Sequence, residues 1–139
     1  FYRGKTEAAI IADVIAKNQR AGKIGTVYWV VDETELPGGD VSAQNDYFFE
    51  SWEWVGGRVQ VNMAKARLHH MNQIRRVRDA ELAELDVPFM KAIEAGDLLE
   101  QKRIGGLKQA LRDLPQTFDL TSYVTPETLR VAWPAGLSK

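Results

Sequence analysis

The chain has 139 residues, of which 45% are hydrophobic and 27% charged, and its net charge is −1. This length fits one domain, or a small domain with an extension, and the near-neutral charge selects neither an acidic nor a basic partner. The absence of cysteine excludes disulfides, thiol catalysis and thiolate metal sites. No apolar run approaches the roughly 18 residues that cross a bilayer, so we expect no membrane partner.

Residues 1–61 are predicted to form a small α/β head. Thr6 can cap a helix, because apolar residues recur at helical spacing from Ala8 to Ala16. The β-branched and aromatic run Thr26–Val31 predicts a strand buried on both faces. The polar, turn-rich segment Asp32–Asn45 predicts a loop.

A β-hairpin is predicted at the end of this head. Two runs of mixed apolar and polar residues, Phe48–Trp54 and Arg58–Asn62, flank Val55-Gly56-Gly57. Trp52 and Trp54 would lie on the same face of the first strand, because side chains alternate along a strand. These rings either cover the core of the head or form an aromatic surface that grips a partner protein.

Residues 62–115 are predicted to form a helical stalk or hairpin. The period of the apolar residues changes to 3.6 near Asn62, which can cap the first helix. Asp86 is expected to cap a new helix, with Pro88 in its first turn. The apolar stripe of the first helix needs a partner, which is another helix, another copy or another protein. The stripe comprises Leu68, Met71, Ile74, Val77, Leu82 and Leu85.

Residues that typically cap or end helices predict two more helices in the rest of the chain. Gly96 is expected to end one helix, Asp97 to cap the next and Pro115 to stop it. Residues 116–139 are expected to hold a linker and a short helix that docks back onto the stalk through its apolar residues. Thr125 caps that helix, and Leu129 and Trp133 dock it. The predicted class is therefore α+β, with an α/β head and β-hairpin followed by a charged helical hairpin or stalk.

Charge is unevenly distributed along the predicted stalk. Six basic residues and no acid lie between Trp54 and Arg78, whereas seven acids and one base lie between Asp79 and Glu100. We interpret the two blocks as solvated helix faces that attract each other, within one hairpin or between chains. A nucleic-acid patch made by Arg75, Arg76 and Arg78 is the alternative, which the neighbouring acidic block and the lack of a nucleic-acid fold signature disfavour.

The sequence indicates no active site. His69 and His70 are adjacent, and neighbours on a helix point about 100° apart, so they cannot share one metal ion unaided. No serine lies in a nucleophile turn, and neither glycine pair carries the lysine and hydroxyl partners of a phosphate loop. We therefore predict no enzyme activity, no cofactor and no metal.

Several short motifs run in order through most of the chain. They are Tyr28-Trp29-Val30-Val31-Asp32-Glu33, Glu35-Leu36-Pro37, Trp52 and Trp54, Val59–Arg67, Ile74–Asp79, Leu82, Leu85-Asp86, Ala95-Gly96-Asp97, Lys108–Asp113, Thr125-Pro126-Glu127 and Trp133-Pro134. In this order and spacing they resemble a family of small bacteriophage proteins encoded among tail genes, which includes tail fibre and tail assembly chaperones. The chain departs from that family in a longer insert, Gly38–Tyr47.

The resemblance implies a phage-tail context more firmly than a molecular activity. We therefore predict a non-enzymatic virion protein of the tail, assembled in the host cytoplasm, that forms a homo-oligomer and contacts a tail fibre or baseplate protein. A transient chaperone of tail fibres, absent from the mature virion, is the alternative, and a nucleic-acid-binding regulator is a third. The interaction residues are expected to be Trp52, Trp54, Leu68, Met71, Ile74, Arg75, Arg76, Val77 and Arg78.

Overall fold

The structure, a computed structural model, describes residues 6–20, 22, 31–32, 35–37 and 47–138. The chain divides into two compact units, Phe1–Asp32 and Glu33–Lys139. The described residues combine helices with one two-stranded antiparallel sheet, which confirms the predicted α+β class. The boundary expected between residues 61 and 62 does not separate compact units, because the β-hairpin belongs to the same unit as the helices that follow it.

The first unit contains helix α1 (Glu7–Arg20). The predicted cap is present, because the Thr6 hydroxyl accepts a hydrogen bond from the Ala9 N–H at 3.3 Å. Residues 26–30 of the predicted strand lie outside the described residues. The same holds for residues 33–34 and 38–45 of the predicted loop.

The second unit begins its regular structure with the predicted β-hairpin, β1 (Trp52–Val55) and β2 (Arg58–Val61). The strands pair antiparallel, and the two-residue turn consists of Gly56 and Gly57, with φ of +59° and +85°. Positive φ at both positions is typical of a type I′ turn, which glycine adopts without the Cβ penalty of other residues.

The first strand is shorter than predicted. A 3₁₀ turn, η3 (Phe49–Ser51), occupies the residues before Trp52, where the strand was expected to start at Phe48. The Ser51 N–H donates to the Phe48 carbonyl at 2.8 Å, which closes this turn. Burial of the Phe48 ring, only 1% exposed, outweighs the strand propensity of the segment.

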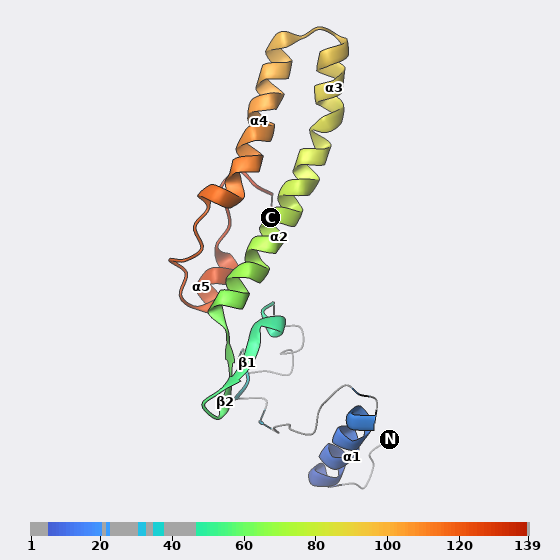
Figure 1. Cartoon of the computed structure of the whole chain (residues 1–139), viewed down its shortest axis with the longest axis vertical. Helices are drawn as coiled ribbons and strands as arrows, with labels where there is room; N and C mark the ends of the chain where they lie inside the picture. The colour runs from blue at the N-terminus through green and yellow to red at the C-terminus, as the bar shows by residue number, and fades with distance from the viewer. Residues whose placement is uncertain (1–5, 21, 23–30, 33–34, 38–46, 139) are drawn as a thin grey trace. The chain divides into compact units, whose positions relative to one another are not determined.

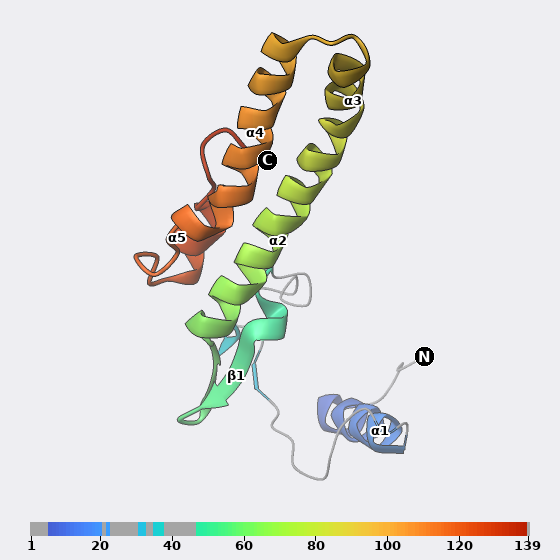
Figure 2. The same cartoon turned by 45° about the horizontal axis from the view of Figure 1, so that its top comes forward.

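Three helices form an arm, which we define as α2 (Met63–Glu84), α3 (Asp86–Glu94) and α4 (Leu98–Thr117). Figures 1 and 2 show α2 and α3 following one another along one side, and α4 returning along the other. Asn62 caps α2 as predicted, since its side chain accepts from the N–H groups of Ala64 and Lys65 at 3.0 and 3.1 Å.

The junction of α2 and α3 differs from the prediction at one residue. Asp86 is the first residue of α3 and not its cap; Leu85 occupies the cap position with helical backbone angles and no side-chain cap. The Asp86 carboxylate instead binds the Lys108 ammonium of α4. Pro88 lies in the first turn of α3, as expected.

The other end of α3 and the start of α4 follow the sequence signals. Gly96 has φ of +68° after the last helical residues, and the Asp97 carboxylate accepts from the Glu100 N–H at 3.0 Å. The prediction that Pro115 stops α4 is wrong, because the helix continues to Thr117. The Thr117 hydroxyl donates to the Leu114 carbonyl at 3.2 Å, and this contact helps to hold the last turn.

The short helix α5 (Pro126–Val131) docks onto the base of the arm. Thr125 and Thr128 form a capping box at its start. Two clusters of buried residues form the core: the first comprises Phe48, Ala66, Leu120, Leu129 and Ala132, and the second Ile74, Leu111 and Leu137. The predicted docking through Leu129 and Trp133 is confirmed, because Leu129 is fully buried in the first cluster and Trp133 lies against the second.

Two glycines of the arm give a matched test of its backbone. Gly96→Ala is expected to lower the free energy of unfolding by about 1 kcal/mol, because its positive φ disfavours a Cβ atom. Gly106→Ala is expected to raise it by about 1 kcal/mol, because α4 is regular there and an added Cβ meets no atom within 4 Å. Urea unfolding of both variants measures the two effects. Changes of the same sign in the free energy of unfolding would contradict the backbone conformations of these two glycines.

Candidate interaction surfaces

The base of the arm is held together by a buried histidine that sequence reasoning did not assign. His70 is 1% exposed, and its Nδ1 lies 2.8 Å from the Tyr47 hydroxyl. Its Nε2 lies 2.6 Å from the Ala132 carbonyl, which can only accept, so Nε2 carries a proton and donates to it. His70 is therefore part of the buried interior. The available signal was its spacing of four residues from Ile74, which places it on the inward face of α2.

Arg67, a member of the basic block, also serves the fold. The Arg67 guanidinium donates to the Leu120 carbonyl at 3.0 Å and to the Tyr123 carbonyl at 3.0 Å. These two carbonyls belong to the irregular segment between α4 and α5, in which the Leu120 carbonyl also accepts from the Tyr123 N–H at 3.3 Å. Arg67 thus joins this segment to α2 and is not part of a free cationic face.

The predicted aromatic surface on β1 is half-buried. Trp52 and Trp54 lie on one face of the β-hairpin, opposite Val61 and Val59 on β2. The Phe49 ring stands 5.1 Å from the Trp52 ring, measured between centroids. Whether these rings contact a partner protein remains a prediction.

The predicted apolar stripe of α2 is largely covered by the chain itself. Ile74 is fully buried in the second cluster, and Met71 and Val77 are half-buried against it. Leu68 departs from the stripe, with 60% of its surface exposed. Ile74 therefore belongs to the core of this unit, and it does not lie on a surface that a partner can reach.

The predicted arginine cluster is divided between two environments. Arg75 and Arg76 are exposed, and each donates to a neutral amide one turn earlier, on Asn72 and Gln73. Arg78 pairs with Asp79 at 2.7 Å.

Within the chain the two charge blocks mostly do not pair with one another, contrary to the within-hairpin interpretation, and attraction between chains stays a prediction. In the described part of the chain the acidic block pairs with bases of α4, since Glu100 binds Arg103 at 2.6 Å and Asp86 binds Lys108. The basic block contributes a pair to the β-hairpin, Lys65 with Glu53 at 2.5 Å. Arg78–Asp79, at the boundary of the two blocks, is the pair that joins them.

The Glu53 contact has a pH signature. Its pKa is lowered from the ordinary 4.5, first by the hydrogen bond from Lys65 and then by that from Asn62. A carboxyl with a lowered folded-state pKa stabilises the fold above its unfolded-state pKa, and this contribution is lost as the pH falls through the folded-state pKa. We expect Glu53→Gln to weaken the acid dependence of urea unfolding, whereas Glu50→Gln, which changes an exposed residue of η3, should not. Identical acid dependence in wild type and Glu53→Gln would refute the contact.

An exposed apolar surface lies where α3 turns into α4, at the end of the arm remote from the β-hairpin (Figure 1). We call it the arm tip. On α3 two of its side chains are three residues apart and so share one face, and two leucines open α4. The exposed fractions are 54% for Met90, 45% for Ile93, 76% for Leu98 and 83% for Leu99. The sequence predicted helices on both sides of Gly96 and did not identify this surface.

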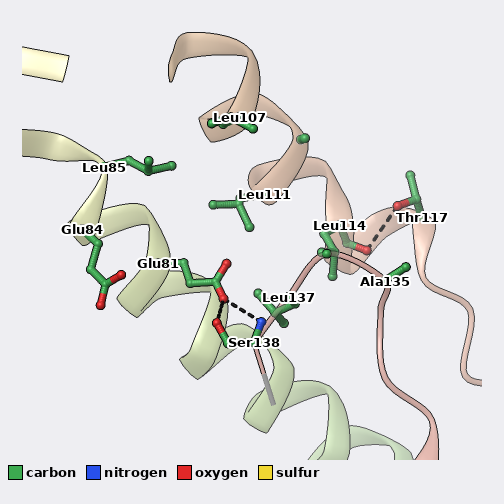
Figure 3. A pocket seen from close by; sticks show the side chains of 12 residues that line it. Glu81, Glu84, Leu85, Leu107, Leu111, Leu114, Thr117, Ala135, Leu137 and Ser138 are labelled. Atoms are coloured by element: carbon green, nitrogen blue, oxygen red, sulfur yellow. Dashed lines mark hydrogen bonds between the residues drawn. The ribbon is translucent and has the colours of Figure 1, made fainter. Parts of the chain in front are cut away.

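A groove of about 750 Å³ runs between α2 and α4 beside the C-terminal segment (Figure 3). Leu85, Leu107 and Leu111 give it an apolar floor, and Glu81 and Glu84 lie along its α2 side. The C-terminal segment enters one end of the groove. There the Glu81 carboxylate accepts hydrogen bonds from the Ser138 N–H, at 2.7 Å, and from the Ser138 hydroxyl.

Within the described residues, no group of three or more histidine, cysteine, aspartate or glutamate residues could hold a metal ion. No helix in that part of the chain is both long enough and apolar enough to span a membrane. Comparison of the chain with protein-family models, with curated proteins and with solved structures finds no match.

Proposed function

We propose that this chain is a non-enzymatic structural or adaptor protein of a bacteriophage tail, which binds a tail fibre or baseplate component through the arm tip. The tail context rests on the ordered motifs of the sequence. The choice of surface rests on one observation, the four large apolar side chains exposed around the α3–α4 turn, Met90, Ile93, Leu98 and Leu99. Several large apolar side chains exposed within one short stretch of a fold are typical of a protein–protein contact.

The construction of the arm supports this choice of surface. The inward residues Ala92 and Ile104 are 6% and 0% exposed, so α3 and α4 are packed together without using the tip leucines. Leu98 and Leu99 follow directly after the Asp97 cap, which fixes the start of α4. The tip is thus an exposed apolar surface on a packed support, which reduces the ordering cost that a partner must overcome.

The predicted homo-oligomer does not require the stripe of α2, because Ile74 is already covered. If copies associate, the exposed tip is the apolar surface that we expect to be used. Sedimentation velocity of the wild-type chain and of Met90→Asp, which places a charge in the tip, tests this directly. We expect the charged variant to sediment as the smaller species, and equal mass for both would place any self-contact elsewhere.

The proposed function is tested by mass spectrometry of gradient-purified phage particles that carry this gene. A structural adaptor is expected at a small fixed copy number per virion. Presence in the infected-cell lysate together with absence from purified particles would favour the transient chaperone and would contradict the adaptor role.

A further inference from the structure

The groove between α2 and α4 is already occupied at one end by the chain's own C-terminal segment. The Leu137 side chain is 7% exposed and lies with Ile74 and Leu111 in the second cluster. The next residue, Ser138, donates its N–H and its hydroxyl to the Glu81 carboxylate. The bound segment therefore follows a simple rule, in which an apolar side chain contacts α4 and the following residue donates to a glutamate of α2.

This segment is held firmly enough to serve as a template for binding. The Trp133 indole N–H lies 3.1 Å from the Leu137 carbonyl and 2.9 Å from the Ser138 carbonyl. Backbone and side-chain groups of the segment are thus both bonded. Figure 3 shows Ser138 bonded to Glu81, and Leu137 beside them on the side toward Leu114.

One turn further toward the arm tip, the same two features recur. Glu84 follows Glu81 by three residues on α2, and Leu107 precedes Leu111 by four residues on α4, so both repeats lie one turn along the groove. Glu84 is exposed, and its carboxylate has no hydrogen-bond or ion-pair partner among the residues that the structure describes. Leu107 is 44% exposed.

We propose that this end of the groove binds an extended segment of a partner protein in which an apolar residue is followed by lysine or arginine. The apolar side chain would cover Leu107 and Leu85, as Leu137 covers Leu111. The cation would bind Glu84, because an exposed carboxylate beside an apolar floor favours a long basic side chain that can lie along that floor. This inference goes beyond the proposed function, because it concerns a second surface and holds whether or not the arm tip binds a tail component.

The probes are two peptides that copy the chain's own Ala-Gly-Leu pattern, acetyl-Ala-Gly-Leu-Lys-amide and acetyl-Ala-Gly-Leu-Glu-amide. They are titrated into the full chain carrying ¹³C-labelled leucine methyl groups, up to about 10 mM, which saturates even a site with a Kd of about 1 mM. The lysine peptide is expected to shift the methyl signals of Leu85 and Leu107 and to bind about fivefold more tightly than the glutamate peptide. Glu84→Lys is expected to reverse the preference. The control Glu94→Lys changes an exposed acid of α3 outside the groove and should leave the preference unchanged.

Three outcomes would overturn the inference. The absence of shifts at Leu85 and Leu107 would show that the groove does not bind such segments. Equal affinity for both peptides, or an equal effect of Glu94→Lys and Glu84→Lys, would show that Glu84 does not select the cation. Shifts centred on Leu137 would show that the peptides displace the C-terminal segment and do not bind beside it. Because the titration uses no phage component, its result is independent of the copy-number measurement.

Discussion

Ile74→Asp is expected to unfold the second unit, lowering its free energy of unfolding by about 4 kcal/mol or more. Ile74 is completely buried between Leu111 of α4 and Leu137 of the C-terminal segment. A carboxylate there would lose its hydration without gaining a cation, because the second cluster that surrounds it is apolar. Chemical unfolding followed by circular dichroism measures the loss.

Two matched variants identify the cause of that loss. Ile74→Val keeps the site apolar and should cost only about 1 kcal/mol, the usual effect of removing one buried methylene. Asn72→Asp introduces the same charge at an exposed position of α2, and its free energy of unfolding should stay within about 0.5 kcal/mol of that of wild type. If Ile74→Asp melted like wild type but changed the oligomeric mass, Ile74 would be an interface residue and the described core would be wrong.

His70→Leu is expected to lower the free energy of unfolding by about 2–4 kcal/mol. The leucine fills much of the volume but leaves the Tyr47 hydroxyl and the Ala132 carbonyl without the imidazole that now binds them. The imidazole also stands 5.9 Å from the Trp133 ring, in an edge-to-face arrangement that leucine cannot make. The segment after α5 would therefore loosen together with the segment before η3.

A double-mutant cycle separates the hydrogen bond from the packing. Tyr47→Phe removes the hydroxyl alone, and its effect should be smaller in the His70→Leu background than in wild type, by about 0.5–2 kcal/mol. Unfolding energies of the four proteins give this coupling. Strict additivity would mean that the contact between the Tyr47 hydroxyl and His70 contributes nothing to stability.

Local chemistry of the chain was readable from sequence because it depends on near neighbours. The caps at Asn62, Asp97 and Thr125 were all predicted correctly, since each acts on amides within three residues. The glycine turn at 56–57 was predicted for the same reason. Pro115 misled the prediction because a hydroxyl two residues later helps to hold the turn that proline weakens.

Contacts between residues far apart in the chain could not be predicted from the sequence. The buried histidine and the groove both depend on such contacts. Nothing near His70 in the chain indicates Ala132, which lies 62 residues away, and nothing near Glu81 indicates Ser138, which lies 57 residues away. Periodicity identified the stripe of α2 but could not say that α4 and the C-terminal segment cover Ile74. It likewise assigned Met90 and Leu99 to helices without showing that the α3–α4 turn leaves them exposed.

The central claim, that the arm tip attaches this chain to the tail, is tested most directly by virion incorporation of the double variant Leu98→Gln/Leu99→Gln. Both leucines are exposed, so the free energy of unfolding of the variant should lie within about 0.5 kcal/mol of that of wild type. Leu68→Gln, an exposed leucine near the other end of the arm, is the control. We predict that particles complemented with the tip variant lose the protein, whereas wild type and Leu68→Gln are retained at equal copy number. Normal incorporation of the folded tip variant would contradict the account.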